Sequence, residues 1–385
     1  MTHRTLLCLA ALSLPLAASA QVAVSSNDGK TTIVDGVNTV PPMPQPDMVS
    51  VLDLSVMPPR VIGEVAVPGG WSAPPQSVAV TPDGSLALVT SGARLDPANP
   101  SRTVFNDTLT VIDLTATPPA AIATLKTGAR AAGVSINAAG TLALVANRAA
   151  GTLSVFTIAG RSVTPAGTVD LDAPGSDPSL PVFAPDGRSA YVTRNGDHRV
   201  SILAVEGSTV TYTGRDISSN LRPYSIDLTP DGAFAVVGNI GNGPTGGVDT
   251  VSLIDLRPPL PRVVDAVVVG LIPEGLAVSP DGQHVAVCIQ NGSNLSPRSP
   301  LFSTYGLMRI YRIDAARLAQ VAEARIGRWC QGVAWSGDGR GVIVQAALDH
   351  EIQAFAFDGA RLDSRGAVRV TGAPTGLRTP AARPR

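Results

Sequence analysis

The chain has 385 residues, of which 44% are hydrophobic and 15% are charged, and its formal net charge is −1. This apolar fraction supports a packed core and excludes general disorder. A nearly neutral chain without basic runs is also a poor candidate for non-specific nucleic-acid binding, so no nucleic-acid partner is expected. The 38 glycines and 33 prolines recur along the whole chain, which favours many short strands joined by turns.

Residues 1–20 have the pattern of a secretory signal peptide. Arg4 is followed by an apolar run over residues 6–18, and Ala18-Ser19-Ala20 offers small residues at the cleavage position. The run is too short for a comfortable membrane span, and no later stretch reaches about 18 apolar residues. The sequence therefore predicts cleavage after Ala20, a periplasmic or secreted protein, and no membrane span in the mature chain.

A repeated unit follows over residues 21–371. Each copy has an apolar strand, a turn of the Pro-Asp-Gly type and a second apolar strand. In such a turn Pro sets φ at the first position, Asp accepts from a backbone N–H, and Gly takes a positive φ. Clear turns occur at residues 82–84, 185–187, 230–232 and 280–282, and degenerate copies at 27–29, 138–140 and 337–339.

Two further strands complete the unit. Weaker fourth strands are expected at 61–67, 121–125 and 263–269. Third strands are expected at 48–54, 109–114, 153–158, 200–205, 251–256, 308–313 and 352–357. Four antiparallel strands in each of seven units indicate an all-β, seven-bladed β-propeller.

The ends of the repeat leave the closure of the ring open. The first and last units each hold four expected strands, so no strand exchange is obvious. Residues 21–26 could instead pair outside their own blade. Residues 372–385 are rich in Gly, Ala and Pro and end in Arg-Pro-Arg, so they are expected to form a flexible C-terminal tail.

Several second strands carry a recognisable ending. Tyr191-Val192-Thr193-Arg194 follows one turn, and the segments 142–147 and 234–239 end in Asn147 and Asn239. This pattern resembles the YVTN-type β-propeller repeat, close to the lactonase-like and surface-layer-protein-like propellers, over residues 21–371. For the lactonase-like members, the resemblance implies a hydrolase acting on a lactone or cyclic ester.

The expected topology separates two faces. All Asp-Gly turns lie on one face, the bottom face, and the loops from second to third strands lie on the opposite, top face. Long top loops are expected at residues 35–47, 91–108, 239–250 and 291–307, either because they form a site or because insertions are tolerated there. They surround the mouth of the central channel, which is the usual concave site of such a fold.

Residues at the strand ends on the top face are candidates for ligand binding. Several arginines and amides there suit an anionic or polyhydroxylated ligand, although each arginine could also be a locally paired surface charge. The ligand-binding candidates are Gln76, Arg130, Arg194, Tyr224, Asn239, Asn291, Trp329 and Gln331.

A catalytic function would depend on a different set of residues. If the chain were lactonase-like, Glu274 would be the acid/base, and Arg222 and Arg328 would bind a carboxylate or oxyanion. His350 is a weaker acid/base candidate, because the preceding Asp349 could orient it; a turn role is the alternative.

Cysteine chemistry limits the cofactors. Cys288 and Cys330 are the cysteines outside the signal peptide, and in an oxidising compartment such a pair suggests a disulfide. Two small buried hydrophobic side chains are the alternative, and a Cα separation below about 7 Å is the condition to check. Without CxxC spacing, neither a c-type haem nor a four-cysteine zinc site is expected, and no metal or other cofactor is predicted.

Three functions remain open, since propellers host many activities. The leading hypothesis is an exported, monomeric, non-catalytic binding or scaffold protein that holds a protein partner or a small ligand on its top face. The alternatives are a lactonase-like hydrolase and a propeller subunit that partners a periplasmic redox enzyme. No GxSxG, HExxH or P-loop motif points elsewhere.

Overall fold

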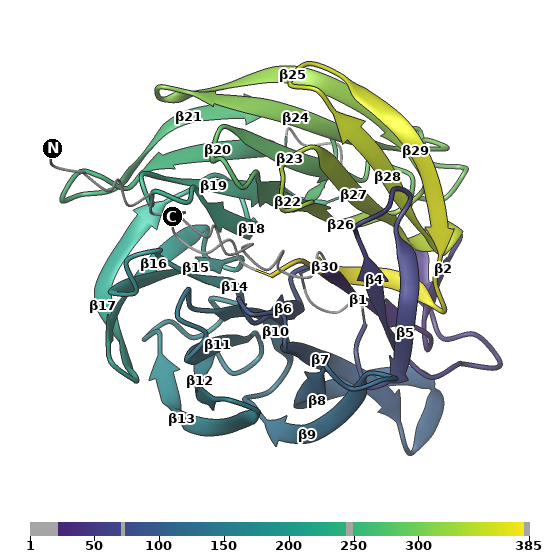
Figure 1. Cartoon of the computed structure of the whole chain (residues 1–385), viewed down its shortest axis with the longest axis horizontal. Coiled ribbons are helices and arrows are strands. Elements are labelled where there is room, and N and C mark those ends of the chain that lie inside the picture. Colours follow the sequence, from purple (N-terminus) through teal and green to yellow (C-terminus); the bar gives the residue numbers. More distant parts are fainter. Residues whose placement is uncertain (1–21, 71–73, 244–248, 381–385) are drawn as a thin grey trace, which may run out of the picture.

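The computed structural model describes residues 22–70, 74–243 and 249–380, so the predicted signal peptide lies outside the described residues. The chain forms seven four-stranded antiparallel sheets arranged around a central axis (Figure 1). This confirms the seven-bladed β-propeller. Helical structure in the described residues is limited to one 3-10 turn, η1 (Ala347–Asp349), and no described helix is long and apolar enough to cross a membrane.

Each blade is named here by its position along the chain, with its strands given from the axis outward. Blade 1 contains β30 (Ala373–Arg378), β1 (Val22–Asp28), β4 (Met48–Asp53) and β5 (Arg60–Ala66). Blade 2 contains β6 (Val78–Val80), β7 (Leu86–Asp96), β8 (Asn99–Asp113) and β9 (Ala120–Lys126). Blade 3 contains β10 (Ala131–Ile136), β11 (Leu142–Asn147), β12 (Thr152–Ala159) and β13 (Ser162–Asp170). Blade 4 contains β14 (Pro178–Phe183), β15 (Ser189–Arg194), β16 (Arg199–Glu206) and β17 (Thr209–Ser218).

The remaining blades follow the same order. Blade 5 contains β18 (Pro223–Leu228), β19 (Phe234–Asn239), β20 (Thr250–Asp255) and β21 (Arg262–Val268). Blade 6 contains β22 (Pro273–Val278), β23 (His284–Ile289), β24 (Gly306–Asp314) and β25 (Arg317–Ile326). Blade 7 contains β26 (Cys330–Trp335), β27 (Gly341–Ala346), β28 (Glu351–Phe357) and β29 (Leu362–Arg369). A small hairpin of β2 (Thr32–Val34) and β3 (Val37–Thr39) stands apart from the blades.

The hydrophobic core is divided among the interfaces between blades. One cluster joins Leu144 and Leu153 of blade 3 to Val192 and Leu203 of blade 4. Each sheet therefore packs on both faces, which explains why the second strands are apolar runs rather than alternating sequences. Each such side chain contributes roughly 1.5–3 kcal/mol by burial.

The bottom turns form as the sequence predicts. In blade 2, Asp83 accepts from the Thr81 hydroxyl at 2.6 Å and from the Ser85 N–H at 3.0 Å. These bonds, led by the Thr81 hydroxyl, hold the pKa of Asp83 below its usual value. Asp231 is bonded in the same way by Thr229 and the Ala233 N–H.

A contact between neighbouring turns predicts a graded loss of stability. Gly282 has φ +73°, and a Cβ there would lie 2.9 Å from Cδ of Pro230 in the turn of the preceding blade. Gly187 has φ +68° with no atom within 4 Å of its Cβ position, so it is the matched control. We expect Gly187→Ala to lower the free energy of unfolding by about 1 kcal/mol, and Gly282→Ala by about 1 kcal/mol more. Equal losses in urea titrations would contradict the inter-turn contact.

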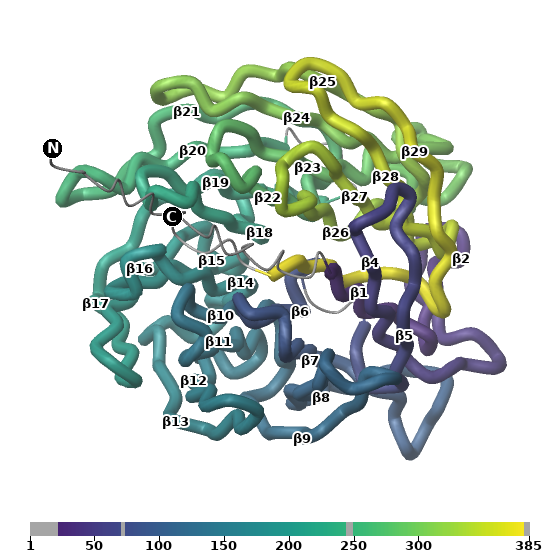
Figure 2. Tube along the Cα trace, in the orientation of Figure 1, coloured from purple at the N-terminus to yellow at the C-terminus, as the bar shows by residue number. Residues whose placement is uncertain are grey.

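The ring is closed by a strand from the predicted tail, which corrects that prediction. Residues 373–378 form β30, the innermost strand of blade 1, which pairs with β1 from Val24↔Arg378 to Asp28↔Ala373. Figure 2 shows β30 and β1 side by side there. β1 is therefore the second strand of its blade, and its inner edge would expose unpaired backbone groups without β30.

The predicted turn at residues 27–29 is also wrong, for the same reason. Blade 1 begins with its second strand, so no covalent turn joins β30 to β1, and Asp28 ends β1 on the top face. There Lys30 Nζ bonds Asp28 Oδ2 at 3.3 Å, Asp47 Oδ2 at 2.8 Å and the Gly69 carbonyl at 2.9 Å. This buried group anchors both ends of the top loop of blade 1.

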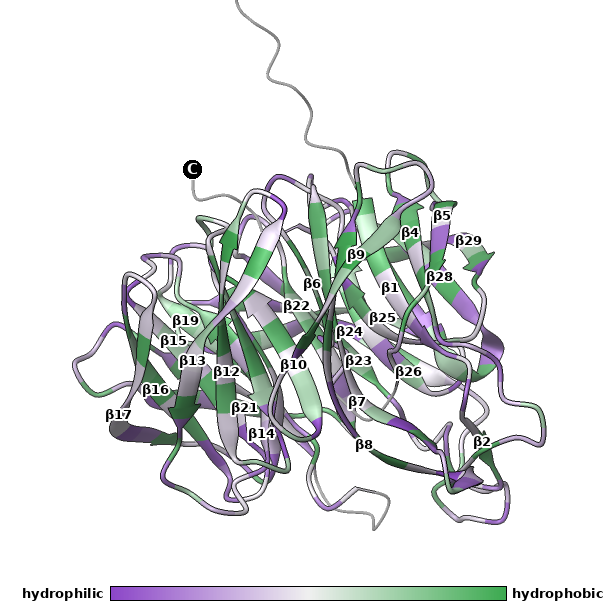
Figure 3. Cartoon of the chain, turned by 90° about the horizontal axis from the view of Figure 1, so that it is seen from below, coloured by the Kyte–Doolittle hydropathy of each residue, from purple (hydrophilic) through white to green (hydrophobic). Residues whose placement is uncertain are grey.

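Two of the expected top loops are regular structure. The segment 91–108 mostly continues β7 and β8 as a long hairpin, and the segment 35–47 contains half of the β2–β3 hairpin. Figure 3 shows both hairpins projecting from the same end of the propeller. The β2–β3 hairpin also reaches across the seam, the place where the ring closes between blades 7 and 1. Asp35 of this hairpin pairs with Arg298 and bonds Ser296 in the top loop of blade 6.

Candidate functional site

The inner strands share an irregularity near their start on the top face. A register shift follows the first residue of β10, β14, β18, β22 and β26. Aligning these shifts gives one equivalent position in every blade. It is the second residue of the inner strand in blades 3–7, the residue after Pro374 in β30 of blade 1, and the residue that precedes Ser77 in blade 2. The seven residues at this position are Gln76, Ala132, Ser179, Tyr224, Glu274, Gln331 and Thr375, all of them buried.

Glu274 is the acidic member of this ring. Its Oε2 accepts from Nε2 of Gln290, which follows the end of β23, at 2.9 Å. Burial raises the pKa of Glu274 to about 8, and the positive charge of Arg148 opposes this only in part. The carboxyl group is therefore mostly protonated at neutral pH and can donate a hydrogen bond.

Arg148 is the main residue that the sequence analysis missed. Its guanidinium is paired with Asp177, with Nε at 2.6 Å from Oδ1, and lies 5.4 Å from the centroid of the Tyr224 ring. Burial alone would lower the pKa of Arg148, but the bonds with Asp177 and Tyr224 outweigh it and raise that pKa. Arg148 follows the last residue of β11 as Gln290 follows the last residue of β23, and this equivalence was the available signal.

These contacts cross the central axis. Arg148 belongs to blade 3 and Glu274 to blade 6, so the two lie three blades apart in a ring of seven and face one another. Gln76 Nε2, from blade 2, reaches the Leu276 carbonyl of blade 6 at 3.4 Å. We call this group the axial cluster; its members are Gln76, Arg148, Asp177, Tyr224, Glu274 and Gln290.

Two groups in the axial cluster lack an internal partner. The side-chain oxygens of Gln76 and Gln290 are buried, and neither accepts a hydrogen bond from the described residues. An unpaired buried amide oxygen costs about 1–3 kcal/mol, so both oxygens are suited to accept from a ligand's hydroxyl groups.

Arg130 adds positive charge at the rim. It lies 5.4 Å from the centroid of the Phe105 ring on the β7–β8 hairpin and 3.9 Å from Asp177. Burial and the neighbouring charge of Arg148 lower the pKa of Arg130 below the ordinary value of an arginine. With Glu274 neutral, two arginines face one aspartate, so Arg130 and the axial cluster together carry about one positive charge at neutral pH.

Two predicted rim residues instead stabilise blade interiors. Asn239 is fully buried; its Nδ2 donates to the Ser252 hydroxyl at 2.9 Å, and its Oδ1 accepts from Ser219 at 2.9 Å. Arg194 donates to the Ser201 hydroxyl at 3.1 Å and pairs with Asp197 and Asp216. These strand-end residues bond within their own sheet, whereas in blades 3 and 6 the next residue along the chain, Arg148 or Gln290, belongs to the axial cluster.

The other predicted catalytic residues do not join Glu274. Arg328 donates from Nη2 to Asp349 at 2.7 Å, and Arg222 donates to Oδ1 of Asn195 at 3.0 Å. His350 is exposed in a left-handed turn with φ 56°. Asp349, which was expected to orient His350, instead binds Arg328. Among the described residues, no hydrogen bond or ion pair links these three residues to Glu274.

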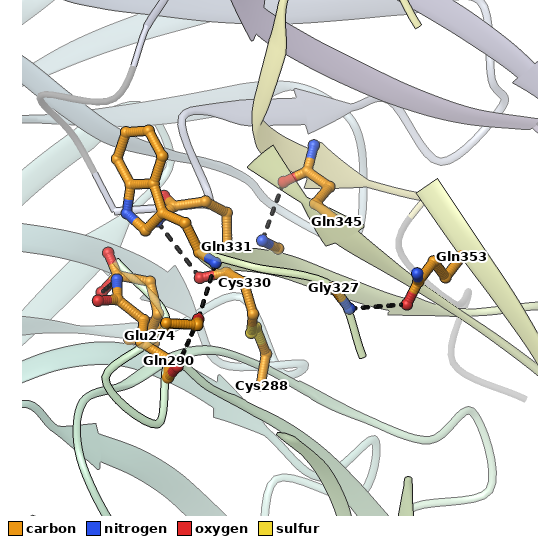
Figure 4. Close-up of a disulfide and its surroundings, with 12 residues drawn as sticks. Glu274, Cys288, Gln290, Gly327, Cys330, Gln331, Gln345 and Gln353 are labelled. Carbon is orange, nitrogen blue, oxygen red and sulfur yellow. Dashed lines mark hydrogen bonds between the residues drawn. A yellow bond between two sulfur atoms is a disulfide. The ribbon is translucent and has the colours of Figure 1, made fainter. Parts of the chain in front are cut away.

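Three further ligand candidates have distinct positions. Trp329 packs with Ile33 under the β2–β3 hairpin, so it contributes to the seam. Asn291 donates to Ser303 at 3.1 Å and holds the top loop of blade 6. Gln331 is one of the seven equivalent residues at the start of the inner strands, and it lies next to Glu274 and Gln290 (Figure 4).

A disulfide ties two blades together beside this cluster. Cys288 of β23 and Cys330 of β26 are bonded, with a Cα separation of 6.0 Å, which meets the condition set from the sequence. Cys330 directly precedes Gln331, and Cys288 lies two residues before Gln290 (Figure 4). The crosslink therefore restrains two side chains at the mouth of the channel.

Two surface cavities lie elsewhere. One of about 210 Å³ is lined by residues of blades 2 and 3 that include Lys126 and Phe156, and one of about 500 Å³ by residues that include Glu323 and Arg361. Neither is lined by a member of the axial cluster. The axial cluster is thus distinguished by its buried polar chemistry.

Comparisons with known proteins support the fold. No family model and no curated protein sequence matches the chain, so membership in the YVTN repeat family stays a prediction. Among solved structures, a candidate 6-phosphogluconolactonase from Bacteroides uniformis aligns with TM-score 0.70 at 16% identity, over 94% of this chain and 99% of that one. The periplasmic gluconolactonase of Pseudomonas aeruginosa aligns with TM-score 0.66 at 14% identity, over 94% and 99%. Hydrazine synthase of Kuenenia stuttgartiensis aligns with TM-score 0.59 at 18% identity, over 76% and 79%.

Proposed function

We propose that the protein binds a small polyhydroxylated anion at the top end of its central channel, through the axial cluster. The observation that carries this proposal is the combination of a net positive charge with two buried amide oxygens, on Gln76 and Gln290, that lack internal partners. Arg148 and Arg130 would attract the anionic group, and the amide oxygens would accept from hydroxyl groups. The protonated carboxyl of Glu274 would donate to the same ligand.

A specific observation also favours hydrolysis of a lactone at this place. Glu274 has a pKa of about 8 and lies across the axis from Arg148, whose guanidinium would stabilise an oxyanion. Water would add to the lactone carbonyl while Glu274 takes its proton; the ring C–O bond then breaks, and the leaving oxygen takes that proton. The product is a hydroxy acid, the same ligand class that the cluster suits.

The two candidate functions differ in their dependence on pH. Glu274 is neutral below about 8 and negative above it, so an anionic ligand is repelled at high pH. We expect the affinity for gluconate to fall about 10-fold as the pH rises through 8, measured by calorimetry. In Glu274→Gln this fall should vanish, since gluconate keeps its charge throughout.

Hydrolysis should show the opposite trend, because only the ionised carboxylate can act as a base. Turnover of glucono-lactone that rises through pH 8 in the wild type, and is lost in Glu274→Gln, would establish the enzyme. Gluconate binding with no turnover above the buffer rate would establish the binding protein. The proposal is contradicted if gluconate binds with the same affinity at pH 6.5 and 9.5, or does not bind.

Export and a protein partner belong to the same proposal. The disulfide supports folding in an oxidising compartment, as the predicted signal peptide requires. Exposed apolar side chains on the top-face hairpins, Val34, Val37 and Phe105, supply a surface that a protein partner could contact.

A further inference from the structure

A second pair of charged residues faces the axis nearer the bottom face. The seven equivalent positions that include Gln76, Tyr224 and Thr375 form the axial ring. Three residues further along the inner strands lie Asp227 on β18 and Arg378 on β30. In the other five blades, the equivalent residues are Ala79, Ser135, Val182, Ala277 and Ala334. Asp227 and Arg378 are therefore the charged members of this lower ring.

The two residues lie on inner strands at opposite sides of the channel. Blades 5 and 1 are three positions apart in the ring of seven, so their mutual attraction acts across the axis. Burial raises the pKa of Asp227, and the charge of Arg378 opposes that rise. Burial likewise lowers the pKa of Arg378, and Asp227 opposes that change.

The pair is not in contact. Within residues 22–70, 74–243 and 249–380, no ion pair joins Arg378 to Asp227, and the Arg378 guanidinium has no hydrogen-bond partner. Asp227 accepts only backbone bonds, from the Val278 N–H at 3.0 Å and the Leu228 N–H at 3.1 Å. A half-buried guanidinium with five unpaired donors is suited to a carboxylate, which it can bind through two parallel bonds.

The lower ring is separate from the axial cluster. Three residues of extended strand place it roughly 10 Å further along the axis. The Gln76 side chain crosses the axis at the level of the axial cluster and reaches the Leu276 carbonyl. The two rings can therefore be tested independently.

We propose that Asp227 and Arg378 form a second binding site, for a small amino carboxylate. The carboxylate of this zwitterion would pair with Arg378, and its ammonium group would pair with Asp227 on the opposite wall. Opposite charges on facing walls favour a ligand that carries both charges over a simple anion or cation of the same size, because each wall then gains a partner.

Three probes of matched size test the site on the full-length protein: β-alanine, propionate and propylamine. We expect β-alanine to bind at least about 10-fold more tightly than either single-charge probe, measured by calorimetry or ligand-observed NMR. Asp227→Asn should reduce the affinity for β-alanine to that for propionate, and Arg378→Gln should abolish binding. If Arg378→Gln fails to fold, the affinity of Asp227→Asn for β-alanine is sufficient to test the site.

Glu274→Gln is the control, since it alters the axial cluster and should leave β-alanine binding unchanged, as should saturating gluconate. The proposal is overturned if β-alanine binds no better than propionate, or if Asp227→Asn leaves its affinity intact. It is also overturned if Glu274→Gln or gluconate abolishes β-alanine binding, because the probe then occupies the axial cluster. Failure of gluconate to bind would contradict the proposed function without affecting this site.

Discussion

A chain that ends at Gly372 is expected to lose the propeller fold. Truncation removes β30, and with it the hydrogen bonds to β1 and the buried Leu377, which packs with Ala334 and Ile343 of blade 7. The Gln345 side chain, which donates to the Gly376 carbonyl at 2.8 Å, would also lose its acceptor. Since neighbouring blades share their core, one missing inner strand weakens the interfaces on both sides of blade 1.

We expect this loss to exceed about 5 kcal/mol, which is comparable to the whole stability of a typical domain. The measurement is thermal unfolding by circular dichroism, together with the yield of soluble protein. A chain that ends at Pro380 retains β30 and is the matched control, which should unfold like the full-length protein. A truncation at Gly372 that melts cooperatively within a few degrees of that control would show that β30 does not close the ring.

Arg148→Gln is expected to have the largest effect on ligand binding. It removes the buried charge that faces Glu274, so we expect the affinity for gluconate to fall about 100-fold, or about 2.7 kcal/mol. It also leaves Asp177 without its main partner. Because the Asp177 side chain is 25% exposed, the loss of folding stability should be about 2 kcal/mol, less than for a fully buried pair.

Two further variants separate binding from folding. The double variant Arg148→Gln/Asp177→Asn should recover most of the stability while its affinity for gluconate stays low. Arg328→Gln removes a half-exposed arginine from its pair with Asp349, outside the axial cluster, so it should cost less than about 1 kcal/mol and leave binding unchanged. Calorimetry and urea unfolding measure the two quantities. Equal binding losses in Arg148→Gln and Arg328→Gln would argue against the axial cluster as the site.

Local chemistry made much of the fold predictable. The Thr-Pro-Asp-Gly-Ser sequence at residues 81–85 contains the groups that hold its turn, so its hydrogen bonds could be anticipated from neighbouring residues. The apolar runs on either side indicated strands covered on both faces. Six turns of this type, together with the strands expected at residues 48–54 and 61–67, indicated a ring of seven blades, although the seventh turn expected at residues 27–29 does not form. The cysteine pair satisfied its distance condition on adjacent blades.

The members of the axial cluster could be predicted only in part by the same reasoning. Gln76, Tyr224 and Glu274 were found because they begin inner strands, whereas Arg148 was missed because Asn147, one residue earlier, ends its strand. A shift of one residue turns a side chain from the sheet interior to the axis. Asn239 and Arg194 were misplaced for the same reason, since their side chains are held by serines of the adjacent strand.

The sequence by itself determined the number of blades and the strands and turns of blades 2–7, because these depend on segments whose residues are close together in the chain. Only the tertiary structure decided how the ring closes, because β30 is a short Pro- and Gly-containing segment that becomes a strand by pairing with β1 at the other end of the chain. Ring closure then decides which side chains meet at the axis. Arg148 and Glu274, and likewise Asp227 and Arg378, are distant in sequence and interact only because blades on opposite sides of the ring face one another.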